Sequence, residues 1–157
     1  LRKSKYILDL GSAPGGWSQY VKQKSKLSEV FAIDILDMES VEGVHFFKES
    51  IEEIDSIDSI YSLIGSFDLV ISDIAPNLTG INAIDSENIF ELNDLTLDTA
   101  VRYLNKSNGC FIMKTFQNNM LKNLRKKMEL SFKIVQTFKP AASKKQSGEI
   151  YLYGAHK

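Results

Sequence analysis

Cysteine is almost absent from this chain of 157 residues, in which Cys110 is the single thiol. One thiol cannot form a disulfide within the chain, and it fits a reducing compartment, so we expect a cytoplasmic protein, with an organellar one left open. Long hydrophobic runs are lacking too. No apolar stretch approaches the ~20 residues that span a bilayer, and no signal peptide is recognisable. We therefore expect neither a membrane protein nor a secreted domain held by disulfides.

The chain also has no excess of charge of either sign, because its 19 Lys and Arg residues nearly balance its 20 Asp and Glu residues. Composition alone thus gives no indication of nucleic acid, and any RNA-binding surface must come from a local basic patch. Histidine is scarce, and His45 and His156 have no Cys or His partner at ligand spacing. We expect no metal site.

Strand-like and helix-like patterns alternate along the whole chain. Strands are expected over 6–10, 30–34, 44–47, 67–72, 109–115, 132–138 and 149–155, and helices over 15–24, 51–64, 84–104 and 118–130. The last two strands follow each other without a helix, which indicates an antiparallel hairpin at one edge of a mostly parallel sheet. The pattern predicts one α/β domain over 1–157, a Rossmann-like sandwich. Its sheet has seven strands, one of them antiparallel, with helices on both faces.

Ligands of such sheets bind beyond the carboxyl ends of the strands, where a glycine-rich turn at 11–16 follows the first strand. Ala13 replaces the second glycine of the dinucleotide fingerprint, and Pro14 has no N–H to offer a pyrophosphate. A nucleoside without phosphates, such as S-adenosylmethionine, fits better, which argues against a nicotinamide-dependent oxidoreductase. Asp34, about 20 residues beyond the turn, is positioned to accept hydrogen bonds from ribose hydroxyls. The alternative is that it only caps the following segment.

Four motifs occur in order and with similar spacing through essentially the whole chain. They are DLGSAPGGWSQ (9–19), SDIAPN (72–77), MKTFQ (113–117) and GEIY (148–151). Together they resemble the FtsJ (RrmJ) family of ribose 2′-O-methyltransferases. The resemblance is strongest to the bacterial branch. It implies an S-adenosylmethionine-dependent enzyme that methylates a uridine of 23S ribosomal RNA within the large subunit.

The resemblance also implies site residues. The family's catalytic Asp, second Lys and Glu fall on Asp73, Lys114 and Glu149, and we expect its first Lys in a segment preceding Leu1. The expected cofactor contacts are Gly11, Gly15, Gly16, Trp17, Asp34, Ser50 and Asp73. Ser50 stands where the family has an acid, so Glu49 or Glu52 could substitute for it.

Methylation of a ribose hydroxyl needs in-line positioning and a base that withdraws the proton. Lys114 is the expected base, which requires its uncharged form; burial and a nearby second cation favour that form. Asp73 is expected to hold Lys114 and to face the sulfonium. Glu149 is expected to orient the ribose or the lysines.

Basic side chains near the last two strands supply the expected RNA contacts, from Lys139, Lys144 and Lys145 to phosphates. The basic run between Lys122 and Lys127 is interpreted instead as the solvent-facing side of its helix. Two alternatives stay open for a chain that we expect to be monomeric: an enzyme acting on tRNA or an mRNA cap, and a non-catalytic RNA-binding factor in ribosome assembly.

Overall fold

The computed structural model describes residues 4–140 and 148–156, and the strands of this part form one seven-stranded sheet. The sheet order is β3-β2-β1-β4-β5-β7-β6. The strands are β1 (Tyr6–Leu10), β2 (Glu29–Asp34), β3 (Val44–Lys48), β4 (Leu69–Ser72), β5 (Cys110–Phe116), β6 (Ile134–Phe138) and β7 (Glu149–Ala155). Strand β7 is antiparallel to both β5 and β6, so β6 again runs in the direction of β1 to β5. The predicted Rossmann-like sheet with one antiparallel strand is confirmed.

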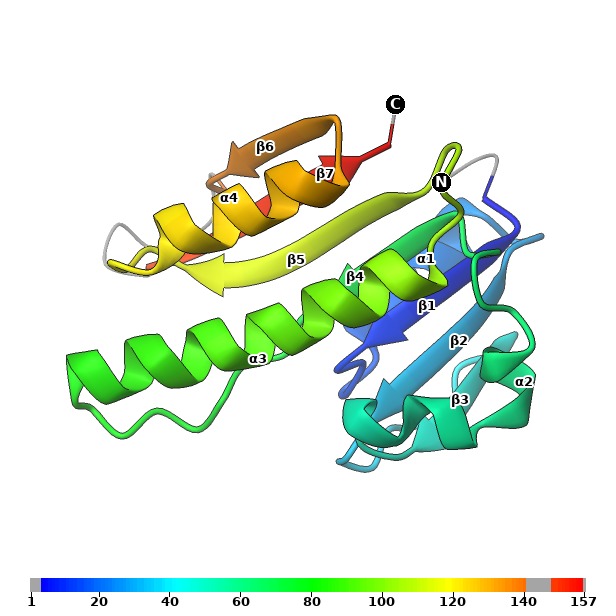
Figure 1. Ribbon diagram of the computed structural model, residues 1–157. Coiled ribbons are helices and arrows are strands. Elements are labelled where there is room, and N and C mark those ends of the chain that lie inside the picture. Colours follow the sequence, from blue (N-terminus) through cyan, green and yellow to red (C-terminus); the bar gives the residue numbers. More distant parts are fainter. Residues whose placement is uncertain (1–3, 141–147, 157) are drawn as a thin grey trace.

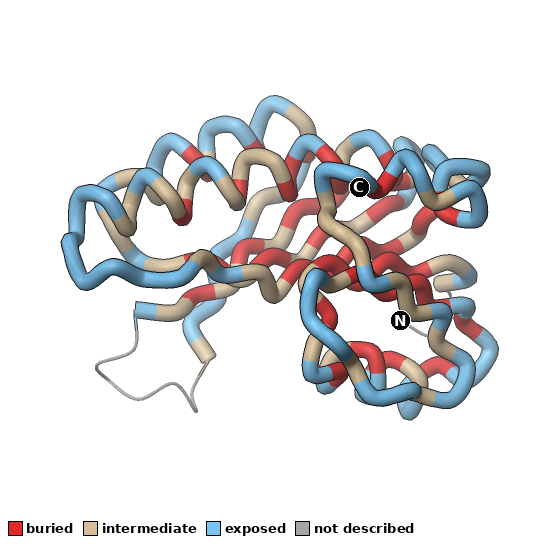
Figure 2. Tube along the Cα trace, turned by 90° about the horizontal axis from the view of Figure 1, so that it is seen from below, coloured by how far each residue is buried: buried red, intermediate tan, exposed pale blue. Residues whose placement is uncertain are grey.

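Helices cover both faces of the sheet unequally (Figure 1). Helices α2 (Asp58–Tyr61), α3 (Asn82–Tyr103) and α4 (Leu121–Ser131) lie on one face, and α1 (Gly16–Lys24) lies on the other. The larger core lies under the three helices and contains Phe67, Tyr103 and Phe111, each fully buried. Burying such a side chain stabilises the fold by about 1.5–3 kcal/mol. Buried positions follow the strands and the sheet-facing sides of the helices (Figure 2).

The expected helix over 51–64 is not continuous. A 3₁₀ helix, η1 (Ile51–Ser56), is separated from α2 by Ile57, whose backbone is extended with φ −92° and ψ 94°. Isoleucines at positions 51, 54, 57 and 60 recur every three residues. That spacing keeps them in line on a 3₁₀ helix, whereas on an α-helix each step of three would drift by about 60° around the axis. The segment therefore buries Ile54 and Ile60 without a regular α-helix.

The carboxyl ends of β1, β2, β4 and β5 meet at one edge of the sheet, because these strands are parallel. The chain beyond each strand is fixed to its neighbour by backbone hydrogen bonds. Gly11 N–H donates to the Ile33 carbonyl at 2.9 Å, and Asp73 N–H donates to the Leu10 carbonyl at 3.1 Å. The functional residues predicted at strand ends therefore converge. None of the helices in the described residues has the length and apolarity needed to cross a bilayer.

Candidate active site

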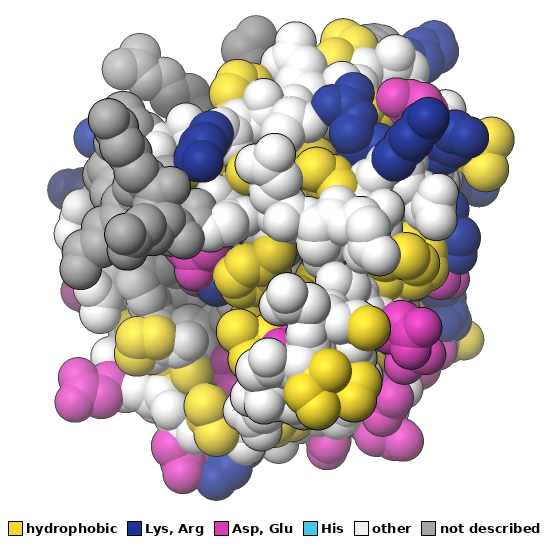
Figure 3. Space-filling model, turned by 90° about the vertical axis from the view of Figure 1, so that its left-hand side faces the viewer, with side chains coloured by type: hydrophobic (Ala, Val, Ile, Leu, Met, Phe, Trp, Pro, Cys, Tyr) yellow, Lys and Arg dark blue, Asp and Glu magenta, His cyan; other side chains and the backbone are white. Residues whose placement is uncertain are grey.

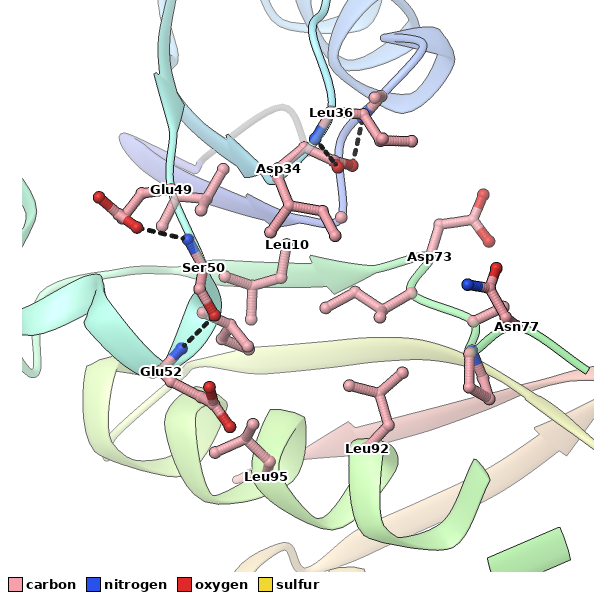
Figure 4. Close-up of a pocket in the computed structure, with 18 residues that line it drawn as sticks. Leu10, Asp34, Leu36, Glu49, Ser50, Glu52, Asp73, Asn77, Leu92 and Leu95 are labelled. Atoms are coloured by element: carbon pink, nitrogen blue, oxygen red, sulfur yellow. Dashed lines mark hydrogen bonds between the residues drawn. The ribbon is translucent and has the colours of Figure 1, made fainter. Parts of the chain in front are cut away.

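A cavity of about 590 Å³ lies at this edge of the sheet, between the strand ends and the side of α3 (Figure 4). Its wall is largely apolar, with Leu10, Leu92 and Leu95 among the lining side chains. The carboxylates of Asp34 and Asp73 lie at the same cavity. Cavities of this size that combine apolar walls with a few placed polar groups are typical small-molecule sites.

Asp34 is held in place at the end of β2 by the backbone around it. Its Oδ2 accepts the Ala13 N–H at 2.9 Å, and its Oδ1 accepts the Leu36 N–H at 2.9 Å. Asp34 therefore also has the alternative role of capping the segment that follows, through the hydrogen bond from Leu36. A carboxylate has about four acceptor positions, so ribose hydroxyls can still donate to it.

The glycine-rich turn passes close to the loop after β4. Gly11 has φ +72°, and a Cβ built there would lie 2.3 Å from Ile74 Cγ1. Both the left-handed backbone and the close approach require glycine. Gly11 lines the cavity, as does Ala13, which is joined to Pro14 by a cis peptide bond.

We expect Gly11→Ala to lower the free energy of unfolding by about 2–4 kcal/mol, from left-handed strain and overpacking together. Gly65→Ala is the matched control. Gly65 has φ +73° but no atom within 4 Å of the added Cβ, so only the left-handed strain of about 1–2 kcal/mol should appear. Denaturant unfolding of the two variants measures the difference. If both variants lose the same free energy of unfolding, the contact with Ile74 does not constrain the turn.

Three other residues expected to contact the cofactor lie outside the cavity lining. Gly15 is the N-cap of α1 and Gly16 is its first residue. The indole of Trp17 packs edge-on against Tyr151 with ring centroids 5.9 Å apart. Ser50 does line the cavity. Its hydroxyl accepts the Glu52 N–H at 3.3 Å and so caps η1.

Glu49 and Glu52 line the cavity beside Ser50, as their proposed substitution for it requires. The Ser50 N–H donates to Glu49 Oε1 at 2.9 Å, which fixes that carboxylate next to the cavity. An acidic group is therefore present at this wall although the aligned position is a serine.

Lys114 and Asp73 form an ion pair in which Nζ lies 2.5 Å from Oδ1. The two side chains are 14% and 31% exposed, so the pair is partly shielded from water. Asp73 lines the cavity and Lys114 does not. The Asp73 carboxylate therefore lies at the cavity and contacts the Lys114 amine at the same time.

Strand pairing brings Glu149 to the same place. Lys114 lies opposite Tyr151, and Phe116 lies opposite Glu149, so Glu149 is a diagonal neighbour of Lys114 at about 7–8 Å. Burial raises the pKa of Tyr151, Asp73 and Glu149 raise it further, and Lys114 opposes them. Tyr151 therefore belongs to this cluster. In the sequence, Tyr151 stands out only as part of the motif GEIY (148–151), and its place opposite Lys114 becomes visible only from the strand register.

The environment of Asp9 is a second feature that was not predicted from the sequence. Asp9 lies inside β1 and is 1% exposed, and Ser18 on α1 donates its hydroxyl proton to Oδ2 at 2.6 Å. Burial raises the pKa of this carboxyl to about 6, and the negative charges of Asp73 and Asp34 add to the effect. An acid in the middle of a buried parallel strand was the available signal.

The expected RNA contacts are only partly visible. Lys139 is exposed just beyond β6, whereas Lys144 and Lys145 lie outside the described residues. Contact of these lysines with phosphates stays a prediction. Within residues 4–140 and 148–156, no three His, Cys, Asp or Glu side chains gather in a way that could hold a metal ion.

Comparison with known proteins adds independent findings. The family model described as FtsJ-like methyltransferase matches residues 1–157. Ribosomal RNA large subunit methyltransferase E of Ehrlichia chaffeensis is 39% identical over 156 residues, which cover 98% of this chain and 73% of the relative. The crystal structure named as that of a ribosomal RNA methyltransferase from Plasmodium falciparum is 26% identical with a TM-score of 0.83. That match covers 96% of this chain and 85% of the other.

A more distant structure shares the fold alone. Human methyltransferase-like protein 13, solved in complex with SAH, is 15% identical with a TM-score of 0.62. The match covers 96% of this chain and 71% of that one.

Proposed function

The chain belongs to the FtsJ-like methyltransferase family, and we propose that it transfers a methyl group from S-adenosylmethionine to a ribose 2′-hydroxyl of RNA. The proposed target is a uridine of 23S ribosomal RNA in the large subunit. The observation that carries the proposal is the Lys114–Asp73 pair, of which Asp73 faces a nucleoside-sized cavity. The family resemblance seen in the motifs is confirmed by the family match.

The residues at the cavity fit S-adenosylmethionine. Asp34 would accept hydrogen bonds from its ribose hydroxyls, and the leucines of the wall would contact its adenine. The turn at 11–16 offers no cradle for phosphates, because Pro14 has no N–H and the Ala13 N–H is already donated to Asp34. The positive sulfonium suits a site with two carboxylates. Bound there, the cofactor supplies an electrophilic methyl group on a good leaving group.

The chain's own residues would then prepare the attacking hydroxyl. Lys114, in its uncharged form, accepts the hydroxyl proton at Nζ. Asp73 positions that amine through the 2.5 Å contact. Glu149 and Tyr151, on the adjacent strand, would limit where the ribose can lie. Such a pair of positioned groups would have no evident use in a non-catalytic assembly factor.

The proposed substrate is tested by methyl transfer from labelled S-adenosylmethionine to large ribosomal subunits that lack the modification. Unmodified tRNA and small subunits serve as parallel acceptors. Label in the large subunit alone is expected. Label only in tRNA would replace the proposed target, and no label in any acceptor despite cofactor binding would favour the non-catalytic alternative.

Asp34→Ala is expected to raise the Kd for S-adenosylmethionine about ten- to hundredfold, since hydrogen bonds to a charged group contribute about 1.5–3 kcal/mol. Asp37→Ala is the control, because its carboxylate pairs with Lys48 and is 86% exposed outside the cavity lining. Calorimetric titration of folded protein gives both values. Similar Kd values for the two variants would remove Asp34 from the cofactor site.

A further inference from the structure

Beside the end of β5, a second hollow of about 450 Å³ runs along the first two turns of α4. We call it the α4 groove. It is lined by Gln117, Asn118, Asn119, Leu121, Lys122, Arg125, Lys126 and Glu129. Lys and Arg side chains gather at the top of the face seen in Figure 3, the end of the molecule where β5 stops and α4 begins.

The cations of the α4 groove differ in how they are neutralised. Arg125 is anchored, with Nη1 donating to Thr137 Oγ1 at 2.5 Å and Nη2 lying 3.6 Å from Glu129. Lys122 and Lys126 are exposed, and no carboxylate of the described residues pairs with either. By contrast Lys127, on the same helix, contacts both oxygens of Asp94 at 2.5 Å. The earlier interpretation of one solvated basic side therefore covers two different groups.

Two features of the exposed lysines would be relieved by a bound anion, although the Glu129 carboxylate lines the same groove. Lys122 and Lys126 are four residues apart, so they are neighbours on one helix face and repel each other. Lys122 also lies in the first turn of α4, which contains no acidic residue. A positive charge at that end opposes the helix dipole. The N–H groups of Met120, Leu121 and Asn123 already donate within the chain, so the attraction for an anion comes from the two ammonium groups and the anchored guanidinium.

We propose that the α4 groove binds the phosphate backbone of the substrate RNA strand next to the nucleotide being methylated. The inference rests on the proposed function. Gln117, the first groove residue, is three positions beyond Lys114 along the chain, about 10 Å on an extended strand. A strand whose ribose reaches Lys114 can thus continue into the groove. The amides of Gln117 and Asn119 supply neutral donors to the same phosphates.

The test compares Lys122→Ala/Lys126→Ala with Lys106→Ala/Lys133→Ala. The control removes equal charge from exposed lysines that precede β5 and β6, at the opposite edge of the sheet. Affinity for a single-stranded RNA oligonucleotide is measured by fluorescence anisotropy over a range of salt. Two lost phosphate contacts should reduce the slope of log K against log salt by about 1.4 and weaken binding on the order of tenfold. S-adenosylmethionine binding and kcat at saturating RNA should not change.

The other possible results distinguish a failure of the α4 groove proposal from a failure of the proposed function. If the RNA affinity of the Lys122→Ala/Lys126→Ala variant has the same salt slope as that of the control, while the wild type still methylates RNA, the α4 groove does not bind the RNA backbone. The proposed function would remain intact. Unchanged RNA affinity with weaker transfer to whole subunits would also overturn the α4 groove proposal, since the groove would then contact a ribosomal protein. Absence of RNA binding and methylation by the wild type would instead contradict the proposed function.

Discussion

Lys114→Met is expected to lower kcat for methyl transfer by about a hundred- to ten-thousandfold, the range typical for loss of a general base. Methionine retains most of the volume of the side chain, which is 14% exposed, but cannot accept the proton. The Kd for S-adenosylmethionine should stay close to that of the wild type, because Lys114 does not line the cavity. Single-turnover kinetics with labelled cofactor separates the two quantities.

Lys133→Met is the matched control for this prediction, since Lys133 is exposed before β6, away from the cavity. It should leave both kcat and cofactor binding unchanged. A Lys114 variant whose kcat equals that of the control would contradict the assignment of the base. If Lys114→Met weakens cofactor binding as well as lowering kcat, Lys114 has a structural role at the cofactor site.

Asp9→Asn is expected to remove a pH dependence of stability. The pKa of Asp9 is raised by burial from 3.8 to about 6, so the folded state binds this proton more tightly than the unfolded state. The stabilisation is fully present below the unfolded value of 3.8 and is lost as the pH rises through about 6. Asp9 thus makes the free energy of unfolding fall by about 3 kcal/mol across this interval.

An asparagine at position 9 cannot titrate, yet its carbonyl can still accept the Ser18 hydroxyl. Its free energy of unfolding should therefore lack this fall between pH 4 and 7. Urea unfolding at several pH values measures the effect. Asp98→Asn, at an exposed position of α3, should keep the wild-type profile. If the unfolding free energies of wild type and Asp9→Asn change with pH in parallel, the pKa of Asp9 is not raised in the folded protein.

The fold, and the meeting of Asp34 and Asp73 at one edge of the sheet, could be predicted because they depend on short-range patterns. Each parallel strand is a buried apolar run, and Asp34 and Asp73 follow such runs directly. Parallel strands bring their carboxyl ends to one edge, so position along the chain was enough to place these residues together. The break at Ile57 was missed because the isoleucine spacing of three was interpreted as helical in general, although it fits a 3₁₀ helix better than an α-helix.

Other features depend on partners far apart in the chain. The free and paired lysines of α4 look alike in sequence, and only the packing of α4 against α3 gives Lys127 its Asp94, 33 residues away. The raised pKa of Asp9 depends on burial under α1 and on two neighbouring carboxylates. Tyr151 lies opposite Lys114 only because of the register of β7 on β5. No local pattern contains that information.

The proposal that the methyl group is transferred to a ribose 2′-hydroxyl is tested most directly by the position of the methyl group in the product. Large-subunit RNA labelled by this enzyme is hydrolysed in alkali, which cleaves the chain through attack of each free 2′-oxygen on its neighbouring phosphate. A methylated 2′-oxygen cannot attack, so the account predicts that the label is recovered in alkali-resistant dinucleotides. Label recovered in mononucleotides would place the methyl group on a base and would contradict the account.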